Sequence, residues 1–138
     1  MAFPGGRRDP ADEDLLATAL RETWEEVGIS VSRETLVGAL KDVLPRTPTL
    51  PPVAVRPFLL MVASRPTVIL NPEVAAAAWV SMSELLRPEA RQRVHVNIQG
   101  QSREVWAYVF EAGVVWGMTE RILTGFIEEL QQVCPTES

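Results

Sequence analysis

The chain has 138 residues, 46% of them hydrophobic, and a formal net charge of −5. This length predicts a single domain over residues 1–138 with one packed core. The acidic balance argues against a general binder of nucleic acid or of anionic membranes, because such proteins carry an excess of Lys and Arg. No apolar stretch approaches the length of a membrane span, and Cys134 is the only cysteine. These features predict a cytoplasmic protein without an internal disulfide.

An amphipathic segment rich in acidic residues predicts the first helix, over residues 9–28. Asp9-Pro10 predicts its start, because proline at the first helical position after an acidic N-cap sacrifices no hydrogen bond. Gly28 predicts its end, since glycine readily adopts the left-handed conformation that stops a helix. The apolar residues of one face lie three or four positions apart, and they are Leu16, Ala19, Leu20, Thr23 and Val27.

A second face of this helix carries three glutamates, Glu22, Glu25 and Glu26. Like charges at these spacings repel by about 0.2–0.5 kcal/mol per pair, and the helix dipole also disfavours anions near the C-terminal end. Two interpretations are open. The first is a solvated acidic face on which Arg21 and Glu25 form a surface ion pair. The second is a site for Mg²⁺ or Mn²⁺, which require clustered oxygen ligands.

The middle of the chain predicts strands separated by proline-rich loops. Residues 35–43 alternate weakly and predict a strand, and residues 44–52 contain four prolines and predict a loop. The apolar run over residues 53–63 predicts a central strand buried on both faces. Residues 68–70 suggest a short strand, residues 71–74 predict a turn, and residues 75–80 predict the approach to a strand that ends at Trp79-Val80.

The last third of the chain has clearer local signals. Ser81 and Glu84 form a capping box that predicts a short helix. Residues 93–98 and 104–110 alternate between apolar and polar side chains, and residues 99–102 predict the turn of a hairpin between them. The apolar stripe over residues 119–133 predicts a final helix. The lone histidine, His95, falls on the first hairpin strand and is interpreted as a structural residue.

The beginning of the chain resembles the Nudix box of the Nudix hydrolases. The match consists of Gly6, five residues, Asp12, eight residues, and then Arg21-Glu22-Thr23-Trp24-Glu25-Glu26-Val27-Gly28-Ile29. It differs from the general pattern by one extra residue before the Arg-Glu pair and by Thr23 in place of a larger apolar residue. With that extra residue, Phe3-Pro4-Gly5-Gly6 and residues 18–22 resemble the coenzyme A pyrophosphatase branch. Residues 46–48, 55–58 and 116–123 resemble the same branch.

This resemblance implies an α/β (α+β) fold, the Nudix α/β/α sandwich with a mixed sheet. Members of this branch carry several tens of residues before the stretch that corresponds to Phe3-Pro4-Gly5-Gly6, and these residues supply the opening strands of the sheet. The chain is therefore expected to lack the N-terminal strands, which leaves strand edges uncovered. An oligomer formed through such an edge is possible.

The resemblance also implies the residues of the active site. Glu22, Glu25 and Glu26 would bind Mg²⁺ or Mn²⁺, and Glu22 would act as the base. Arg21 would orient the glutamates, and Glu73 would add a further acidic group from the loop at residues 71–74. Gly6 would shape the loop over the diphosphate. Asp12 fits either the acidic residue of the motif or an ordinary residue of the helix N-terminus. The residues expected to bind substrate are Gly6, Arg7, Arg8 and Arg46.

The implied reaction is hydrolysis of a diphosphate, and the implied substrate is coenzyme A or an acyl derivative. The products would be adenosine 3′,5′-bisphosphate and 4′-phosphopantetheine. Three alternatives remain at this point. The substrate could be ADP-ribose or a dinucleotide, the chain could be a catalytically silent Nudix-like binding module, or it could be an acidic interaction domain.

Overall fold

A computed structural model of the chain describes residues 1–46 and 53–133. Cys134 and most of the proline-rich loop expected at residues 44–52 lie outside the described residues. The chain divides into two units. The helix–loop unit comprises Phe3–Asp42 and Val55–Ala78. The sheet–helix unit comprises Met1–Ala2, Val43–Ala54 and Trp79–Ser138. The expectation of a single domain over residues 1–138 stays a prediction.

The first helix, α1, spans Leu15–Val27 in the helix–loop unit and begins later than its sequence pattern predicts. Its N-cap is Asp14, whose side chain accepts a hydrogen bond from the Ala17 N–H at 2.8 Å. Asp9 is not the N-cap, because it forms a separate turn with Asp12 ahead of the helix. In that turn the Asp12 N–H donates to the Asp9 carbonyl, and the Asp9 N–H donates to Asp12 Oδ2, both at 2.8 Å.

The end of α1 is confirmed at Gly28, which has a φ of 70° and donates its N–H to the Trp24 carbonyl. A β-carbon built at Gly28 would lie 2.8 Å from both the Cβ and the carbonyl oxygen of Ile69. Glycine is therefore required here for two reasons, the left-handed backbone and the close approach of a second segment.

Two short strands follow in the same unit, β1 at Leu36–Ala39 and β2 at Phe58–Leu60, after a 3₁₀ turn at Arg33–Thr35. They pair antiparallel, with a bulge between Leu36 and Gly38. The prediction of a central strand over residues 53–63 is wrong. The described part of the chain gives β2 only one neighbour, β1 is four residues long, and the proline directly before β2 has no N–H for the ladder. The three residues of β2 are only half-buried.

The segment over residues 61–78 contains no strand, so the expected strand at residues 68–70 is not formed. Two of its backbone donors bond to the end of α1 instead: the Ile69 N–H donates to the Val27 carbonyl at 2.8 Å, and the Asn71 N–H donates to the Glu26 carbonyl at 3.0 Å. The predicted turn at residues 71–74 is confirmed, and the Val74 N–H donates to the Asn71 carbonyl across it.

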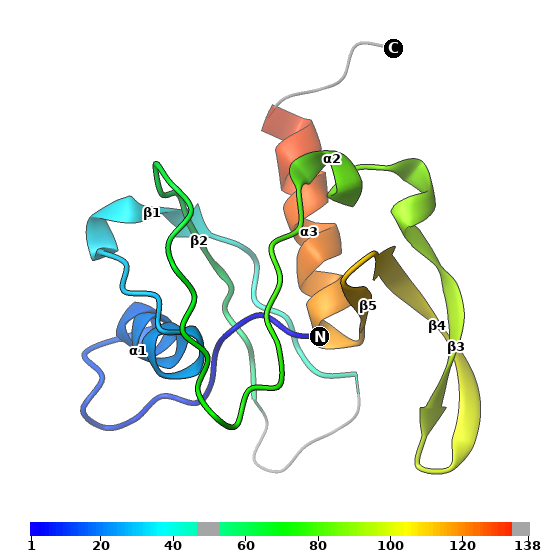
Figure 1. The fold of residues 1–138 in the computed structure, drawn as a ribbon, viewed down its shortest axis with the longest axis horizontal. Helices are drawn as coiled ribbons and strands as arrows, with labels where there is room; N and C mark the ends of the chain where they lie inside the picture. The colour runs from blue at the N-terminus through cyan, green and yellow to red at the C-terminus, as the bar shows by residue number, and fades with distance from the viewer. Residues whose placement is uncertain (47–52, 134–138) are drawn as a thin grey trace. The chain divides into compact units, whose positions relative to one another are not determined.

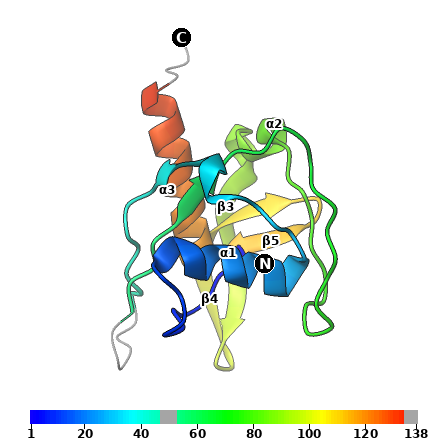
Figure 2. The ribbon, with the colours of Figure 1, turned by 90° about the vertical axis from the view of Figure 1, so that its left-hand side faces the viewer.

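The sheet–helix unit is built on one antiparallel sheet in the order β3-β4-β5. These strands span Arg91–Ile98, Gln101–Phe110 and Gly113–Trp116. The predicted hairpin is confirmed, and it turns at Gln99 and Gly100, which both have positive φ. Positive φ at both central positions matches the twist of the flanking strands. The hairpin extends beyond the final helix of the chain (Figures 1 and 2). The third strand, β5, has no clear alternation and was not predicted.

Helices cover part of this sheet. The final helix, α3, spans Met118–Val133 as predicted, and it contacts β4 and β5. The predicted short helix and its Ser81 N-cap are confirmed: the Ser81 side chain accepts from the Glu84 N–H at the start of α2, Met82–Leu85. The second bond of a capping box is not formed, because Glu84 Oε1 accepts from the Glu111 N–H instead. No strand precedes it at Trp79-Val80, contrary to expectation. A 3₁₀ turn at Pro88–Ala90 leads into β3. The buried core of the unit consists of Leu85, Ala90, Tyr108, Phe110, Val115 and Leu123.

The fold is mixed α/β, which confirms the predicted class. The described strands form two antiparallel sheets, of two and three strands, where a mixed sheet was expected. Sequential strands in both sheets pair directly, so no parallel crossover arises among them. The three-layer arrangement, the possible oligomer and the cytoplasmic location stay predictions. None of the helices described here is long and apolar enough to cross a membrane.

Candidate metal and phosphate site

The last two turns of α1 carry the three glutamates that the sequence predicts as metal ligands. Glu22 is 20% exposed at its side chain and Glu25 is 49% exposed. Glu26 is half-buried. Glu22 lies three and four residues before Glu25 and Glu26, and residues at these spacings are neighbours on the surface of a helix. The three carboxylates therefore lie together near one end of α1.

Arg21 links this acidic turn to the rest of the site. Its Nη1 donates to Glu22 Oε1 at 3.1 Å and to Glu25 Oε2 at 3.2 Å. Its Nε and Nη2 each donate at 3.0 Å to Asp12, in a bidentate pair, and Nη2 also donates to the Arg7 carbonyl at 3.2 Å. The expected orienting role of Arg21 is consistent with these contacts, because a planar guanidinium fixes the direction of each acceptor.

Asp12 anchors Arg21 and is itself 7% exposed. Its Oδ2 also accepts from the Thr18 hydroxyl at 2.9 Å and from the Asp9 N–H. Hydrogen bonding to Arg21, followed by the bond to the Asp9 backbone, holds the pKa of Asp12 well below its usual range. The pKa of Arg21 is raised, first by its hydrogen bonds to Asp12. Asp12 is thus a buried ion-pair partner of Arg21. The buried Thr18 was not predicted, because its contact depends on the turn before the helix.

The Gly5-Gly6 loop lies against two of the glutamates. The Gly5 N–H donates to Glu26 Oε1 at 2.9 Å. A β-carbon built at Gly6 would lie 2.5 Å from both Cδ and Oε1 of Glu22. Any side chain at position 6 would therefore displace the Glu22 carboxylate, which accounts for glycine there by close approach.

The donor set fits a hard divalent cation in its chemistry, since carboxylate oxygens are the ligands that Mg²⁺ and Mn²⁺ prefer. Glu22, Glu25 and Glu26 supply several such oxygens within two helical turns. In this structure the carboxylates accept from Arg21 and from Gly5, and the described residues contain no group of three acidic, His or Cys side chains already arranged to hold an ion. The fit is therefore one of ligand type and of position along the helix.

The loop at residues 69–73 is bonded to the same helix end. Glu73 is exposed, and its N–H donates to the side chain of Asn71 at 2.9 Å. Asn71 in turn donates from Nδ2 to the Glu25 carbonyl at 3.2 Å. The structure thus brings the turn that contains Glu73 to the helix that carries the other glutamates. Asn71 was predicted only as a turn residue, and no local pattern indicates its long-range contact.

The arginines expected to bind substrate differ in their surroundings. Arg7 is exposed. Arg8 donates from Nη2 to the carbonyls of Asp12 and Glu13, at 3.0 and 3.1 Å, so its guanidinium supports the loop before α1. Arg46 is exposed and belongs to the sheet–helix unit.

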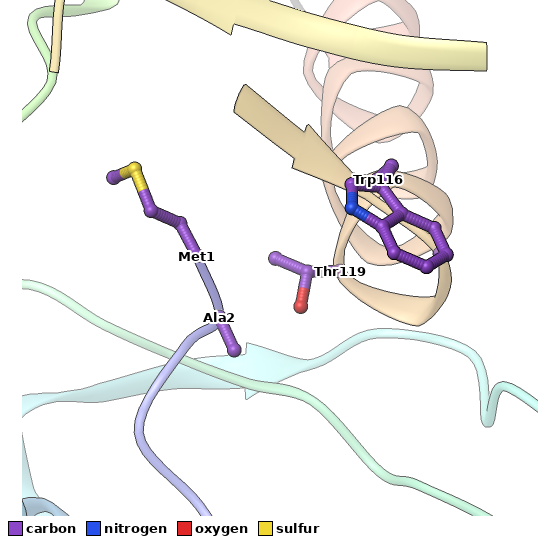
Figure 3. A pocket seen from close by; sticks show the side chains of 5 residues that line it. Met1, Ala2, Trp116 and Thr119 are labelled. Atoms are coloured by element: carbon purple, nitrogen blue, oxygen red, sulfur yellow. The ribbon is translucent and has the colours of Figure 1, made fainter. Parts of the chain in front are cut away.

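A pocket of about 410 Å³ lies in the sheet–helix unit and is shown in Figure 3. Its lining contains Met1 and Ala2 from the start of the chain, and Trp116, Gly117 and Thr119 from the end of β5 and the start of α3. None of these lining residues has an ionisable side chain.

Comparison with known proteins places the chain in a family. The model of the NUDIX domain matches residues 1–99. A protein named "Uncharacterized Nudix hydrolase NudL" from Photorhabdus laumondii is 33% identical over 133 residues, which are 95% of this chain and 68% of that protein. Its namesakes from Cronobacter sakazakii and Citrobacter koseri are 33% and 35% identical, over 94% of this chain and 64% of each protein.

The chain spans about two thirds of the length of these curated relatives. The family match covers the whole acidic turn, the Gly5-Gly6 loop and the loop of Asn71. The chain belongs to the Nudix hydrolase family.

Proposed function

We propose that the protein hydrolyses the diphosphate of a nucleoside diphosphate linked to another moiety, with a divalent metal ion, and that its substrate is coenzyme A or an acyl-coenzyme A. The observation that carries the proposal is the acidic end of α1. There Glu22 and Glu25 accept from one guanidinium, and Glu22 and Glu26 lie against a glycine loop. Nudix hydrolases generally use divalent metal ions.

In the proposed reaction, water substitutes at one phosphorus atom of the diphosphate. One bond forms between the water oxygen and a phosphorus atom, and the bond from that phosphorus to the bridging oxygen breaks. The proton lost by water passes to a base, and the products are two phosphate monoesters. A bound divalent ion would neutralise charge on the phosphoryl oxygens and lower the pKa of water.

The residues of this chain take the remaining roles in the proposal. Glu22, Glu25 and Glu26 hold the metal ion, and Glu22 accepts the proton of water. Arg21 keeps the glutamates oriented through its bidentate pair with Asp12. Glu73 contributes a further carboxylate from its turn.

The choice of coenzyme A rests on the branch resemblance of residues 3–6, of the extra residue before Arg21, and of residues 116–123. The charge of coenzyme A is consistent with this choice, because its 3′-phosphate adds charge that an arginine can pair with. Arg7 suits this role best, since it is exposed while Arg8 is bonded to two backbone carbonyls. The expectation that Arg46 binds substrate stays a prediction.

A catalytically silent binding module is the rival function, and one observation favours it. Among residues 1–46 and 53–133, no three acidic side chains are already gathered around a common point. Glu22, Glu25 and Glu26 each accept a hydrogen bond from Arg21 or from the Gly5 N–H, so each carboxylate has a partner without a cation. Metal-dependent turnover separates the two functions.

The test compares kcat/KM for coenzyme A, dephospho-coenzyme A, ADP-ribose and NADH in Mg²⁺ and in Mn²⁺. We expect coenzyme A to be the best substrate, and removal of the 3′-phosphate to lower kcat/KM at least about tenfold. Arg7→Ala should remove most of this discrimination. If ADP-ribose is hydrolysed best, the proposed substrate is wrong while the diphosphatase activity stands. If none of the four is turned over, the binding module is the better description.

A further inference from the structure

The carbonyl groups at the end of α1 are all bonded, and three of the four partners come from one distant loop. An α-helix leaves its last four carbonyls without partners inside the helix. Here the Trp24 carbonyl accepts from the Gly28 N–H, at 3.0 Å, as the local stop signal predicts. The carbonyls of Glu25, Glu26 and Val27 accept from residues 71, 71 and 69 respectively, at 3.2, 3.0 and 2.8 Å.

Asn71 is the centre of this arrangement, because its backbone and its side chain both donate and both accept. Its N–H and its Nδ2 donate to the carbonyls of Glu26 and Glu25. Its Oδ1 accepts from the Glu73 N–H at 2.9 Å, and its carbonyl accepts from the Val74 N–H at 2.8 Å. One residue therefore fixes the peptide groups of two glutamates and the turn that presents a third.

The chemistry of asparagine suits this position. The end of α1 combines the negative end of the helix dipole with two carboxylates, and its last turn holds no basic residue. A Lys or Arg could cap the same carbonyls, but its charge would pair with the carboxylates and repel a divalent cation. The side-chain amide of Asn71 donates to the carbonyls without adding charge.

We propose that Asn71 is a positioning residue for the metal site. It holds the last turn of α1, with Glu25 and Glu26, and the turn of Glu73 in the arrangement that binds a divalent cation. This inference rests on the proposed function. Its physical basis is that helix ends fray unless their carbonyls are bonded, and that a functional constellation tolerates a displacement of only about 0.5 Å.

The test measures Mn²⁺ binding by electron paramagnetic resonance, without substrate, in the 138-residue chain and three variants. Asn71→Ala removes the donor to Glu25 and the acceptor for Glu73. Asn71→Ser keeps an acceptor two residues before Glu73 but loses the reach to Glu25. Ser32→Ala is the matched control, because Ser32 also accepts from a backbone N–H two residues ahead, in the same unit and at an exposed position. All spectra are taken well below the melting temperature found by circular dichroism.

We expect Asn71→Ala to weaken Mn²⁺ binding at least tenfold, Asn71→Ser to fall between it and the wild type, and Ser32→Ala to bind as the wild type does. Steady-state kinetics with coenzyme A should show a lower kcat with little change in KM, since Asn71 acts through the glutamates. If Asn71→Ala does not fold, Asn71→Ser decides the question against the same control. Mn²⁺ binding by the folded Asn71 variants that equals the control would overturn the positioning role alone. Failure of the wild type to bind Mn²⁺ would overturn both this role and the proposed function.

Discussion

At the scale of single residues, the site depends on one guanidinium whose three nitrogens all donate. Arg21 bonds to the side chains of Asp12, Glu22 and Glu25 and to the Arg7 carbonyl. Charge-assisted bonds of this kind are directional, so they set the rotamers of the acceptors as well as their charge balance. The positions of the Glu22 and Glu25 side chains therefore depend on Arg21, which is itself held by the buried Asp12 in the turn that precedes the helix.

Gly6→Ala should reduce activity with little loss of stability. The new β-carbon would lie 2.5 Å from Cδ of Glu22, and the end of that flexible side chain can move aside at low cost. The displaced carboxylate should lower kcat/KM by at least about tenfold, because small errors in placement are costly in catalysis. Gly38→Ala is the control, since its β-carbon would meet nothing within 4 Å. Equal kcat/KM in both variants would show that the position of Glu22 does not matter.

The pH dependence of stability should reflect Asp12. Its pKa in the folded state is lowered, chiefly by hydrogen bonds from Arg21, relative to an ordinary value of about 3.9. The stabilisation is therefore fully present above about pH 4 and is lost as the pH falls through the folded-state pKa. Urea unfolding from about pH 6 down to about pH 2 should show a steeper loss of free energy of unfolding in the wild type than in Asp12→Asn. An equal loss of free energy of unfolding in the wild type and in Asp12→Asn would contradict this role of Asp12.

At the scale of elements, α1 is a helix whose two ends are fixed by different means. Its start depends on the Asp14 cap and on the turn of Asp9 and Asp12 before it. Its end depends on Gly28 and on the donors of Ile69 and Asn71. The glutamates lie at the end that a distant segment secures, so we expect metal binding to depend on the stability of that turn.

Gly28→Ala should destabilise the protein by about 1–2 kcal/mol from backbone strain alone, since its φ is 70°. The contact of the new β-carbon with the Ile69 carbonyl at 2.8 Å adds to this loss, because a backbone atom cannot move aside cheaply. Chemical denaturation measures the change. Gly125→Ala, in α3, is the comparison, because its β-carbon would meet nothing within 4 Å and alanine favours a helix. Equal stability of the two variants would contradict the account of this helix end.

The elements that the sequence predicts well are those fixed by neighbouring residues. The stop at Gly28, the β3–β4 hairpin, the Ser81 cap and α3 all carry their signals within a few positions. The predicted start of α1 is wrong, because the Asp9 side chain and backbone are used in a turn that competes with the cap. The strand expected at residues 53–63 is reduced to β2, since strand length depends on a partner that sequence periodicity does not reveal.

The same distinction applies to the site. The spacing of Arg21, Glu22, Glu25 and Glu26 is local, so the sequence motif alone is enough to predict them as candidate site residues. Thr18 and Asn71 act across 6 and 46 residues of sequence, through contacts that only the folded chain creates. No helical or strand period encodes such contacts.

At the scale of the whole chain, the two units differ in how they are stabilised. Among the residues that the structure describes, seven of the eight buried hydrophobic ones belong to the sheet–helix unit, and Leu16 is the eighth. In the described residues of the helix–loop unit, the other buried side chains are polar, namely Asp12 and Thr18. The unit that carries the glutamates therefore relies heavily on hydrogen bonds and ion pairs, which respond to pH and salt more than an apolar core does.

The acidic end of α1 is proposed to bind a metal ion for hydrolysis. Without a cation, Glu22 and Glu26 repel across one helical turn by about 0.2–0.5 kcal/mol. Glu26→Gln removes that repulsion and keeps an oxygen acceptor for the Gly5 N–H. Such a variant should fold at least as well as the wild type in a chelator.

The most direct measurement is therefore the turnover of coenzyme A by wild type and Glu26→Gln, in chelator and after addition of Mn²⁺, with the melting temperature of each protein in chelator. We expect wild-type turnover to need Mn²⁺. We expect the variant to keep its melting temperature but to lose at least about 100-fold in kcat/KM, because substitutions of residues that merely support metal ligands already cost up to about 100-fold. Equal turnover of the two folded proteins in Mn²⁺, or full wild-type turnover in chelator, would contradict the claim.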